Sequence, residues 1–207
     1  MLAKTYLETI DALLGKVAEE QAEKLVKAAR MVADAAVSGR RLWVYDKDVV
    51  VASEVSGRAG GLLMVQPLGD VSSVQEGDVV VINAARNDSP SDASLVEKAK
   101  MRKAKTIAIL PFSNPPDASR KLQENVDLAI DDYAEPGDGC LRVAGYNSKV
   151  CPTTGVMNAA VMWAVCAEVV DELRRRGREA HVYKSVFRVG SNEWNAKMSE
   201  EFKRTGY

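Results

Sequence analysis

The chain has 207 residues, a length that fits one domain with a substantial buried core. Apolar residues make up 46% and charged residues 28% of it, the balance of an ordinary globular protein. The formal net charge of -1 argues against a non-specific binder of nucleic acid or of an anionic membrane, so we expect neither as a partner.

Residues 2 to 38 have the pattern of an amphipathic helix. Apolar residues recur there at three- and four-residue steps from Leu7 onward. Gly15 is a weak point and predicts either two helices or one bent helix. Glu8 and Asp11 stand where a signal peptide would be apolar, so we expect a cytoplasmic protein. The apolar stripe needs a covering surface, and a second copy of the chain would supply one.

A strand-to-helix unit follows. Leu42 to Tyr45 is apolar, β-branched and aromatic, as a strand would be. The chain then turns over Asp46, Lys47 and Asp48, and the spacing predicts a helix over 47–59. In open α/β sheets ligands bind at the carboxyl ends of strands, so this first turn is the default binding site.

Further strands alternate with helices along the middle of the chain. A helix is predicted from Asp92 to Arg102, with Ser89-Pro90-Ser91 as its start signal. Four apolar runs read as strands: Leu62–Val65, Asp78–Ile82, Lys105–Leu110 and Asp127–Ile130. This order predicts a doubly wound, flavodoxin/Rossmann-like α/β fold with a five-stranded parallel sheet.

The last third begins with an irregular segment. Residues 131–152 read as a loop with a short strand at 141–143, a length that is usually functional or packed on a neighbour. A long apolar helix should run from Pro152-Thr153-Thr154 to about Arg176. The arginines before Gly177 fit a helix C-terminus, or alternatively a phosphate-binding patch. A final helix is expected near 192–203.

The three cysteines, Cys140, Cys151 and Cys166, lack the paired spacing of a metal site or a disulfide framework. They are predicted to be free thiols in a reducing compartment. The longest apolar stretch, Val156 to Ala167, is far shorter than the ~20 residues that span a bilayer. We see no internal repeat or linker and expect one domain over 1–207, with N-terminal helices at 1–38, an α/β core at 39–176 and a C-terminal extension at 177–207.

The ordered set of segments resembles the SIS (sugar isomerase) domain family, in particular its phosphoheptose isomerase-like members with an N-terminal helical extension. The segments that carry this resemblance are Ser53-Glu54-Val55 with 58–62, 77–83, 99–109, 152–168 and Ser191-Asn192-Glu193-Trp194-Asn195. The resemblance implies a protein that binds a phosphosugar or another sugar derivative, forms a homodimer or larger homo-oligomer, and uses Glu54 as the base of an aldose–ketose isomerisation. It implies no cofactor.

The first loop departs from that family, in which it is rich in glycine and serine so that amides and hydroxyls can hold a phosphate. Here Asp46, Lys47 and Asp48 occupy it. At about 4 Å and an effective dielectric constant of about 20, each carboxylate would repel a phosphate by roughly 4 kcal/mol per unit charge. One lysine does not clearly offset two aspartates.

The second loop, after the third strand, contains Asn83, Ala84, Ala85, Arg86 and Asn87, so alanines replace the family's serines. Arg86 could bind a phosphate or carboxylate, or could equally pair with Asp46 or Asp48.

Together with Thr153 and Thr154, the polar residues of both loops are predicted to line one cleft at the carboxyl edge of the sheet.

The catalytic set implied by the resemblance is incomplete. Trp194 stands where the family has a histidine, and His181, the one histidine, lies in another run. Glu54 could be the base, or a paired surface glutamate.

Two functions remain open: a sugar-derivative binding domain with little or no isomerase activity, which the loop substitutions favour, and a divergent isomerase. The first loop lacks the glycine pattern of a dehydrogenase. Nothing fixes Asp46, Asp48, Asp88 and Glu54 as ligands of a metal such as magnesium, so none is expected.

Overall fold

The computed structural model describes residues 1–47, 49–112, 122–135 and 139–207. Its centre is a five-stranded, fully parallel sheet in the order β2-β1-β3-β4-β5. The strands are β1 (Leu42–Asp46), β2 (Val65–Pro67), β3 (Val79–Asn83), β4 (Lys105–Leu110) and β5 (Leu128–Asp131). The predicted doubly wound fold is confirmed.

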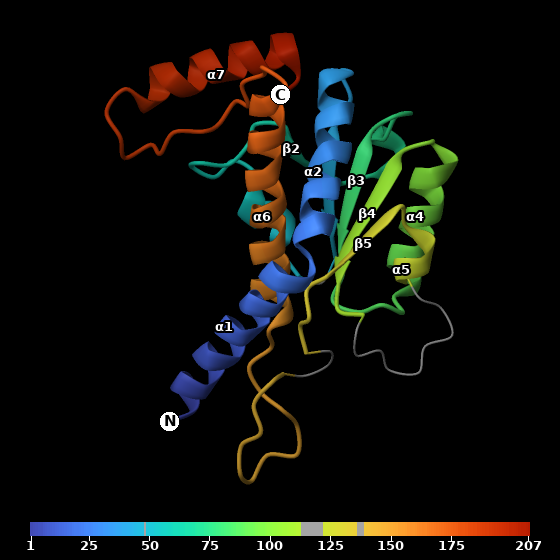
Figure 1. Ribbon diagram of the computed structural model, residues 1–207, viewed down its shortest axis with the longest axis vertical. Coiled ribbons are helices and arrows are strands. Elements are labelled where there is room, and N and C mark those ends of the chain that lie inside the picture. Colours follow the sequence, from blue (N-terminus) through green and yellow to red (C-terminus); the bar gives the residue numbers. More distant parts are fainter. Residues whose placement is uncertain (48, 113–121, 136–138) are drawn as a thin grey trace.

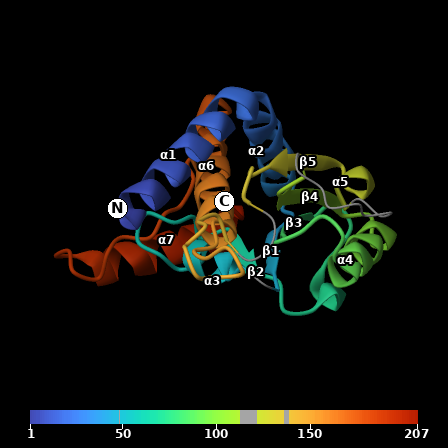
Figure 2. The ribbon, with the colours of Figure 1, turned by 90° about the horizontal axis from the view of Figure 1, so that it is seen from below.

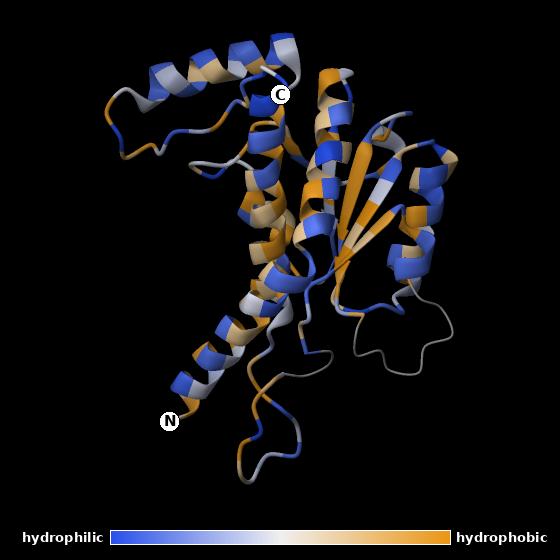
Figure 3. Ribbon diagram, viewed as in Figure 1, coloured by the Kyte–Doolittle hydropathy of each residue, from blue (hydrophilic) through white to orange (hydrophobic). Residues whose placement is uncertain are grey.

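Helices cover both faces of this sheet. One face packs against α2 (Ala22–Val37), α3 (Val51–Val55) and α6 (Thr154–Arg175), and the other against α4 (Pro90–Met101) and α5 (Leu122–Asn125). Figure 2, which looks at the sheet from below, shows α2 and α6 on one side and α4 on the other. Figure 3 shows hydrophobic strands in the layer between them. The sheet is therefore buried on both faces, which explains its continuous apolar runs.

The N-terminal segment forms two separate helices and not one bent helix. The break between them does not lie at Gly15, where it was predicted. Helix α1 (Leu2–Glu20) ends at Gln21, and α2 begins at the next residue. The Gln21 side chain is buried, accepts a hydrogen bond from the Asp131 amide at 3.2 Å and donates one to the Tyr133 hydroxyl at 2.5 Å. A tertiary contact, and not a helix-breaking residue, thus fixes the break.

Two elements are shorter or displaced relative to the prediction. Helix α3 spans Val51–Val55 and not 47–59, because Ser56 is extended and Gly57 is left-handed at φ 68°. Strand β2 starts at Val65, and the preceding Leu62 instead forms an antiparallel bridge with Val182 of the C-terminal segment.

Helices α4, α6 and α7 (Ser191–Thr205) agree with the sequence pattern, whereas the strand suggested at 141–143 does not form. Ser89 caps α4, with its Oγ accepting the Asp92 amide at 3.4 Å. Helix α6 begins at Thr154 as predicted, and α7 crosses the top of the molecule in Figure 1. The suggested strand at 141–143 is reduced to one bridge between Leu141 and Val150. In the described part of the chain, no helix is long and apolar enough to cross a membrane.

This strand order places the switch point of the fold between β1 and β3. Strands on either side of that pair are added in opposite directions, so the connections leave a crevice at its carboxyl end. Asp46 of β1 and Asn83 of β3 are paired in register there.

Replacing Gln21 with alanine should lower the free energy of unfolding by about 1–3 kcal/mol. The variant removes the Gln21 side-chain oxygen that accepts a hydrogen bond from the Asp131 amide. The loss of this buried hydrogen bond destabilises the folded protein. Urea unfolding measures the change, with Glu23→Ala on the exposed side of α2 as the control. Equal stability of the two variants would contradict a structural role for Gln21.

Candidate functional site

Asp46 ends β1 and its carboxylate faces the first turn of α3. Its Oδ2 accepts a hydrogen bond from the Ala52 amide at 2.6 Å. In a phosphate-binding loop, backbone amides of this kind are free for the ligand. Here the protein's own carboxylate takes that place.

The loop between β1 and α3 keeps a conformation that suits glycine. Val50 has φ 54°, in the left-handed region that β-branched residues avoid. The surrounding contacts must hold it there, since such a conformation costs roughly 1–3 kcal/mol. The predicted site residue Asp48 lies outside the described residues. Its neighbour Lys47 is exposed and donates to the Ser91 hydroxyl at 3.4 Å.

Asn83 ends β3 beside Asp46. Leu42 and Val44 of β1 belong to the same core cluster as Val79 and Val81 of β3. Because side chains alternate along strands, Asp46 and Asn83 point to that same face, on strands about 4.8 Å apart.

The Asn83 side chain is 1% exposed, and its Nδ2 donates to the Tyr45 carbonyl at 3.5 Å. Among the described residues its Oδ1 has no hydrogen-bond partner. The end of β3 therefore presents a buried acceptor that lacks a donor.

The loop after β3 is held by its own contacts. Arg86 pairs with Asp88, with Nη2 2.7 Å from Oδ2, and one of its two predicted alternative partners, Asp48, lies outside the described residues. Asn87 is buried and bonds Gln123 through both side-chain atoms, at 2.5 and 3.2 Å, which fixes α5. Ala84 and Ala85 pack inward and offer no side-chain donor.

Glu54, the candidate base, lies near the end of α3 and forms an ion pair with Arg58. Its side chain is 39% exposed. Neither His181 nor Trp194, which stands where the family has a histidine, is available as a catalytic acid, because both make other contacts. His181 is buried between Glu201 and the Tyr207 carbonyl and ties α7 to the body. The Trp194 indole donates to the Val182 carbonyl at 3.2 Å.

A second polar group at the same sheet edge was missed by the sequence analysis. Asp132 follows β5, is fully buried, and accepts the Ala134 amide at 2.9 Å and the Asn158 side-chain amide of α6 at 2.5 Å. Burial raises the pKa of Asp132 to about 7, the neighbouring Asp131 charge adds to the rise, and the Ala134 hydrogen bond opposes it. The rule that located Asp46, a carboxylate directly after a strand, would have found Asp132 as well.

Asn158 repeats the feature seen at Asn83. Its Oδ1 is buried and lacks a hydrogen-bond partner among the described residues. One turn earlier, the predicted site residues Thr153 and Thr154 begin α6, and the Thr153 hydroxyl accepts the Glu135 amide at 3.0 Å. The carboxyl edge therefore carries hydrogen-bond acceptors at the ends of β1 and β3, directly after β5 and in the first turns of α6.

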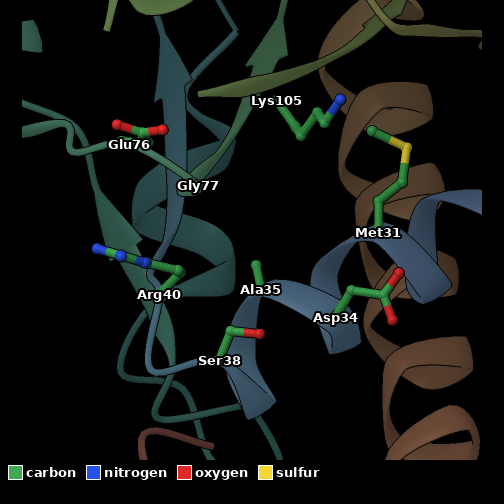
Figure 4. Close-up of a pocket in the computed structure, with 8 residues that line it drawn as sticks. All are labelled: Met31, Asp34, Ala35, Ser38, Arg40, Glu76, Gly77 and Lys105. Atoms are coloured by element: carbon green, nitrogen blue, oxygen red, sulfur yellow. The ribbon is translucent and has the colours of Figure 1, made fainter. Parts of the chain in front are cut away.

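A hollow of about 350 Å³ lies at the other edge of the sheet. Figure 4 shows its lining, in which Arg40 and Lys105 are accompanied by Asp34 and Glu76. These residues stand at the amino ends of the strands and at the end of α2, away from the edge where open α/β sheets bind ligands. We therefore place the candidate site at the carboxyl edge.

Comparison with known proteins places this geometry in a family. A family model described as "Domain of unknown function (DUF2529)" matches residues 5–154. A UPF0309 protein of Shouchella clausii is 24% identical, over 96% of this chain and 95% of its own length.

Solved structures share the fold. A phosphoheptose isomerase from Francisella tularensis superposes with a TM-score of 0.61 at 15% identity, covering 82% of this chain and 96% of its own. The sugar isomerase domain of an RpiR transcription factor from Sphaerobacter thermophilus gives 0.55 at 13% identity, covering 97% and 95%. The fold is therefore that of sugar isomerase domain proteins, as the sequence resemblance implied.

Replacing Asp132 with asparagine should stabilise the protein at pH 8 but not at pH 5. The folded chain holds a proton on Asp132 up to a pH of about 7, whereas the unfolded chain releases it near 3.9. Wild-type stability should thus fall as the pH rises between these values and level off above them.

The variant should gain on the order of 2–4 kcal/mol relative to wild type between pH 5 and pH 8, at 1.36 kcal/mol per pKa unit. Urea unfolding at both pH values measures this, with exposed Asp11→Asn as the control. A constant difference between Asp132→Asn and wild type across this range would show that Asp132 does not titrate there.

Proposed function

The chain belongs to the DUF2529 family, and we propose that it is a sugar-derivative binding protein with the sugar isomerase fold, an altered phosphate loop and little or no isomerase activity. The observation that carries this proposal is the Asp46 carboxylate on the Ala52 amide at the β1/β3 switch point. A bound phosphate would have to displace that carboxylate and then lie beside it.

The side chains at the carboxyl edge of the sheet are suited to a ligand that donates hydrogen bonds. The Asp46 carboxylate and the Asn83 Oδ1, which has no hydrogen-bond partner within the described ranges, are both hydrogen-bond acceptors. Hydroxyl groups of a sugar would satisfy them, and an unpaired buried acceptor costs about 1–3 kcal/mol that such a ligand would recover. Phosphate oxygens can offer nothing to either group when the phosphate is fully ionised.

The catalytic side of the proposal rests on the contacts of the remaining candidates. Isomerisation needs a positioned base and an acid near the moving proton. Glu54 is paired with Arg58, His181 is held by Glu201 and Tyr207, and Trp194 offers no acid. The fold also occurs in a protein named as a transcription factor, so it is not restricted to enzymes.

We further propose that the protein is a homodimer built on α1 and α6. Helix α1 projects from the body in Figure 1, and the helices that it packs against are α2 and α6. Leu2 and Leu7 are 51% and 66% exposed, and Val156 in the first turn of α6 is 46% exposed. A twofold partner would bury this surface against its own copy, as is usual for isologous interfaces.

The ligand class can be read from thermal melting. Neutral sugars and amino sugars should raise the melting temperature, because a ligand at 100 times its dissociation constant adds about 2.7 kcal/mol to the stability. Their 6-phosphates should give no larger shift than the parent sugars. The double variant Asp46→Gly with Asp48→Ser should reverse the preference.

A larger shift with sugar phosphates than with neutral sugars in the wild type would contradict the altered-loop proposal. An unchanged preference in the double variant would show that the loop backbone, and not its charge, governs binding.

The assembly can be tested by light scattering at micromolar concentration. The chain mass is 22.5 kDa, so a dimer should scatter as twice that value. Leu7→Asp should convert it to a monomer, because an interfacial charge cannot be buried unpaired. Glu19→Lys, on an exposed position of the same helix, is the control. A wild-type mass equal to one chain would refute the dimer.

A further inference from the structure

The segment between β5 and α6 contains a tight antiparallel turn-back. Leu141 and Val150 bond each other in both directions, amide to carbonyl, at 3.1 and 2.9 Å. A Cβ built on Gly139 would overlap the Val150 backbone, so the two arms approach closely. One step outward from the Leu141–Val150 pair stand Cys140 and Cys151.

The two cysteines face each other across this turn-back. The Cys140 amide donates to the Cys151 carbonyl at 3.1 Å, and the Cys140 Sγ lies 3.2 Å from the same oxygen. Directly opposed residues of antiparallel arms have Cα atoms about 4.5–5.5 Å apart. Disulfides form between Cα atoms about 4.4–6.8 Å apart, so no large backbone movement is needed.

We propose that Cys140 and Cys151 are a thiol–disulfide pair, reduced in this structure and closed by hydrogen peroxide. The Cys151 thiolate attacks one oxygen of the peroxide and the O–O bond breaks, which gives a sulfenic acid. The hydroxide that leaves takes up the proton lost from the Cys151 thiol and becomes water. The Cys140 thiol then attacks the Cys151 sulfur, the S–S bond forms, and a second water leaves. Two thiols and one hydrogen peroxide thus give one disulfide and two waters.

The order of these steps follows from exposure. Cys151 is exposed, whereas Cys140 is half-buried and burial raises its pKa, so Cys151 meets the oxidant first and Cys140 resolves it. Cys166 differs from both. It lies in the core of α6, where burial raises its pKa to about 12, and it should stay reduced.

A disulfide between Cys140 and Cys151 would lie next to the loop residues that adjoin the candidate site. Cys151 is followed by Pro152, whose carbonyl accepts the Tyr6 hydroxyl of α1 at 3.1 Å, and then by Thr153, which holds the Glu135 amide. A disulfide would link this end of the loop, which Pro152 and Thr153 hold in place, covalently to the segment that follows β5. It would therefore fix the loop beside Asp132 and Asn158.

Oxidation of the native protein with hydrogen peroxide tests the pair. Two of the three thiols should be lost, the chain mass should fall by the mass of two hydrogen atoms, and proteolytic mapping should find the Cys140 and Cys151 peptides joined. Dithiothreitol should restore all three thiols, which separates a disulfide from sulfinic acid.

The Cys140→Ser variant should lose the intramolecular link, while Cys166→Ala should keep it. Peptide mapping of the wild type locates the bond even if a variant fails to fold. Retention of three thiols, an uptake of oxygen that dithiothreitol does not reverse, or a link between two chains would each overturn the proposal.

Discussion

The hydrogen bond from the Ala52 amide to the Asp46 carboxylate is the contact on which the account of the site depends. It joins the end of β1 to the start of α3 at the switch point of the sheet, where this fold leaves a crevice. Because the Asp46 carboxylate already accepts a hydrogen bond from the Ala52 amide, this amide needs no bound anion as its acceptor. The same contact closes a loop that has no glycine and in which Val50 adopts a left-handed conformation.

The other polar side chains at the carboxyl edge of the sheet are also hydrogen-bond acceptors. Asn83 at β3 and Asn158 in α6 each present a buried side-chain oxygen that has no partner among the described residues. Asp132 at β5 is kept close to neutrality by burial, since its pKa lies at about 7. An edge lined by acceptors and a half-protonated acid is suited to hydroxyl groups, and the N-terminal helices are fastened to it through Gln21.

Much of this fold could be predicted from the sequence because its strands are continuous apolar runs with clear boundaries. Strand β4 matched at both ends, and α4 and α6 were signalled by Ser89-Pro90 and by Thr153-Thr154. The break at Gln21 could not be predicted, since it depends on contacts with Asp131 and Tyr133, far away in the chain. In the same way, the sequence identifies Asp46 and Asn83 as strand-end residues, but only the structure shows which of their atoms are occupied.

The Asp46 carboxylate, and not a ligand phosphate, accepts the amide of the loop after β1. Amide chemical shifts measured by NMR during titrations with inorganic phosphate and with a neutral sugar test this most directly. We expect phosphate to leave the Ala52 amide and the Asn83 side-chain amide unshifted at millimolar concentration, and a neutral sugar that binds to shift the Asn83 signal. A saturable shift of the Ala52 amide by phosphate would contradict it.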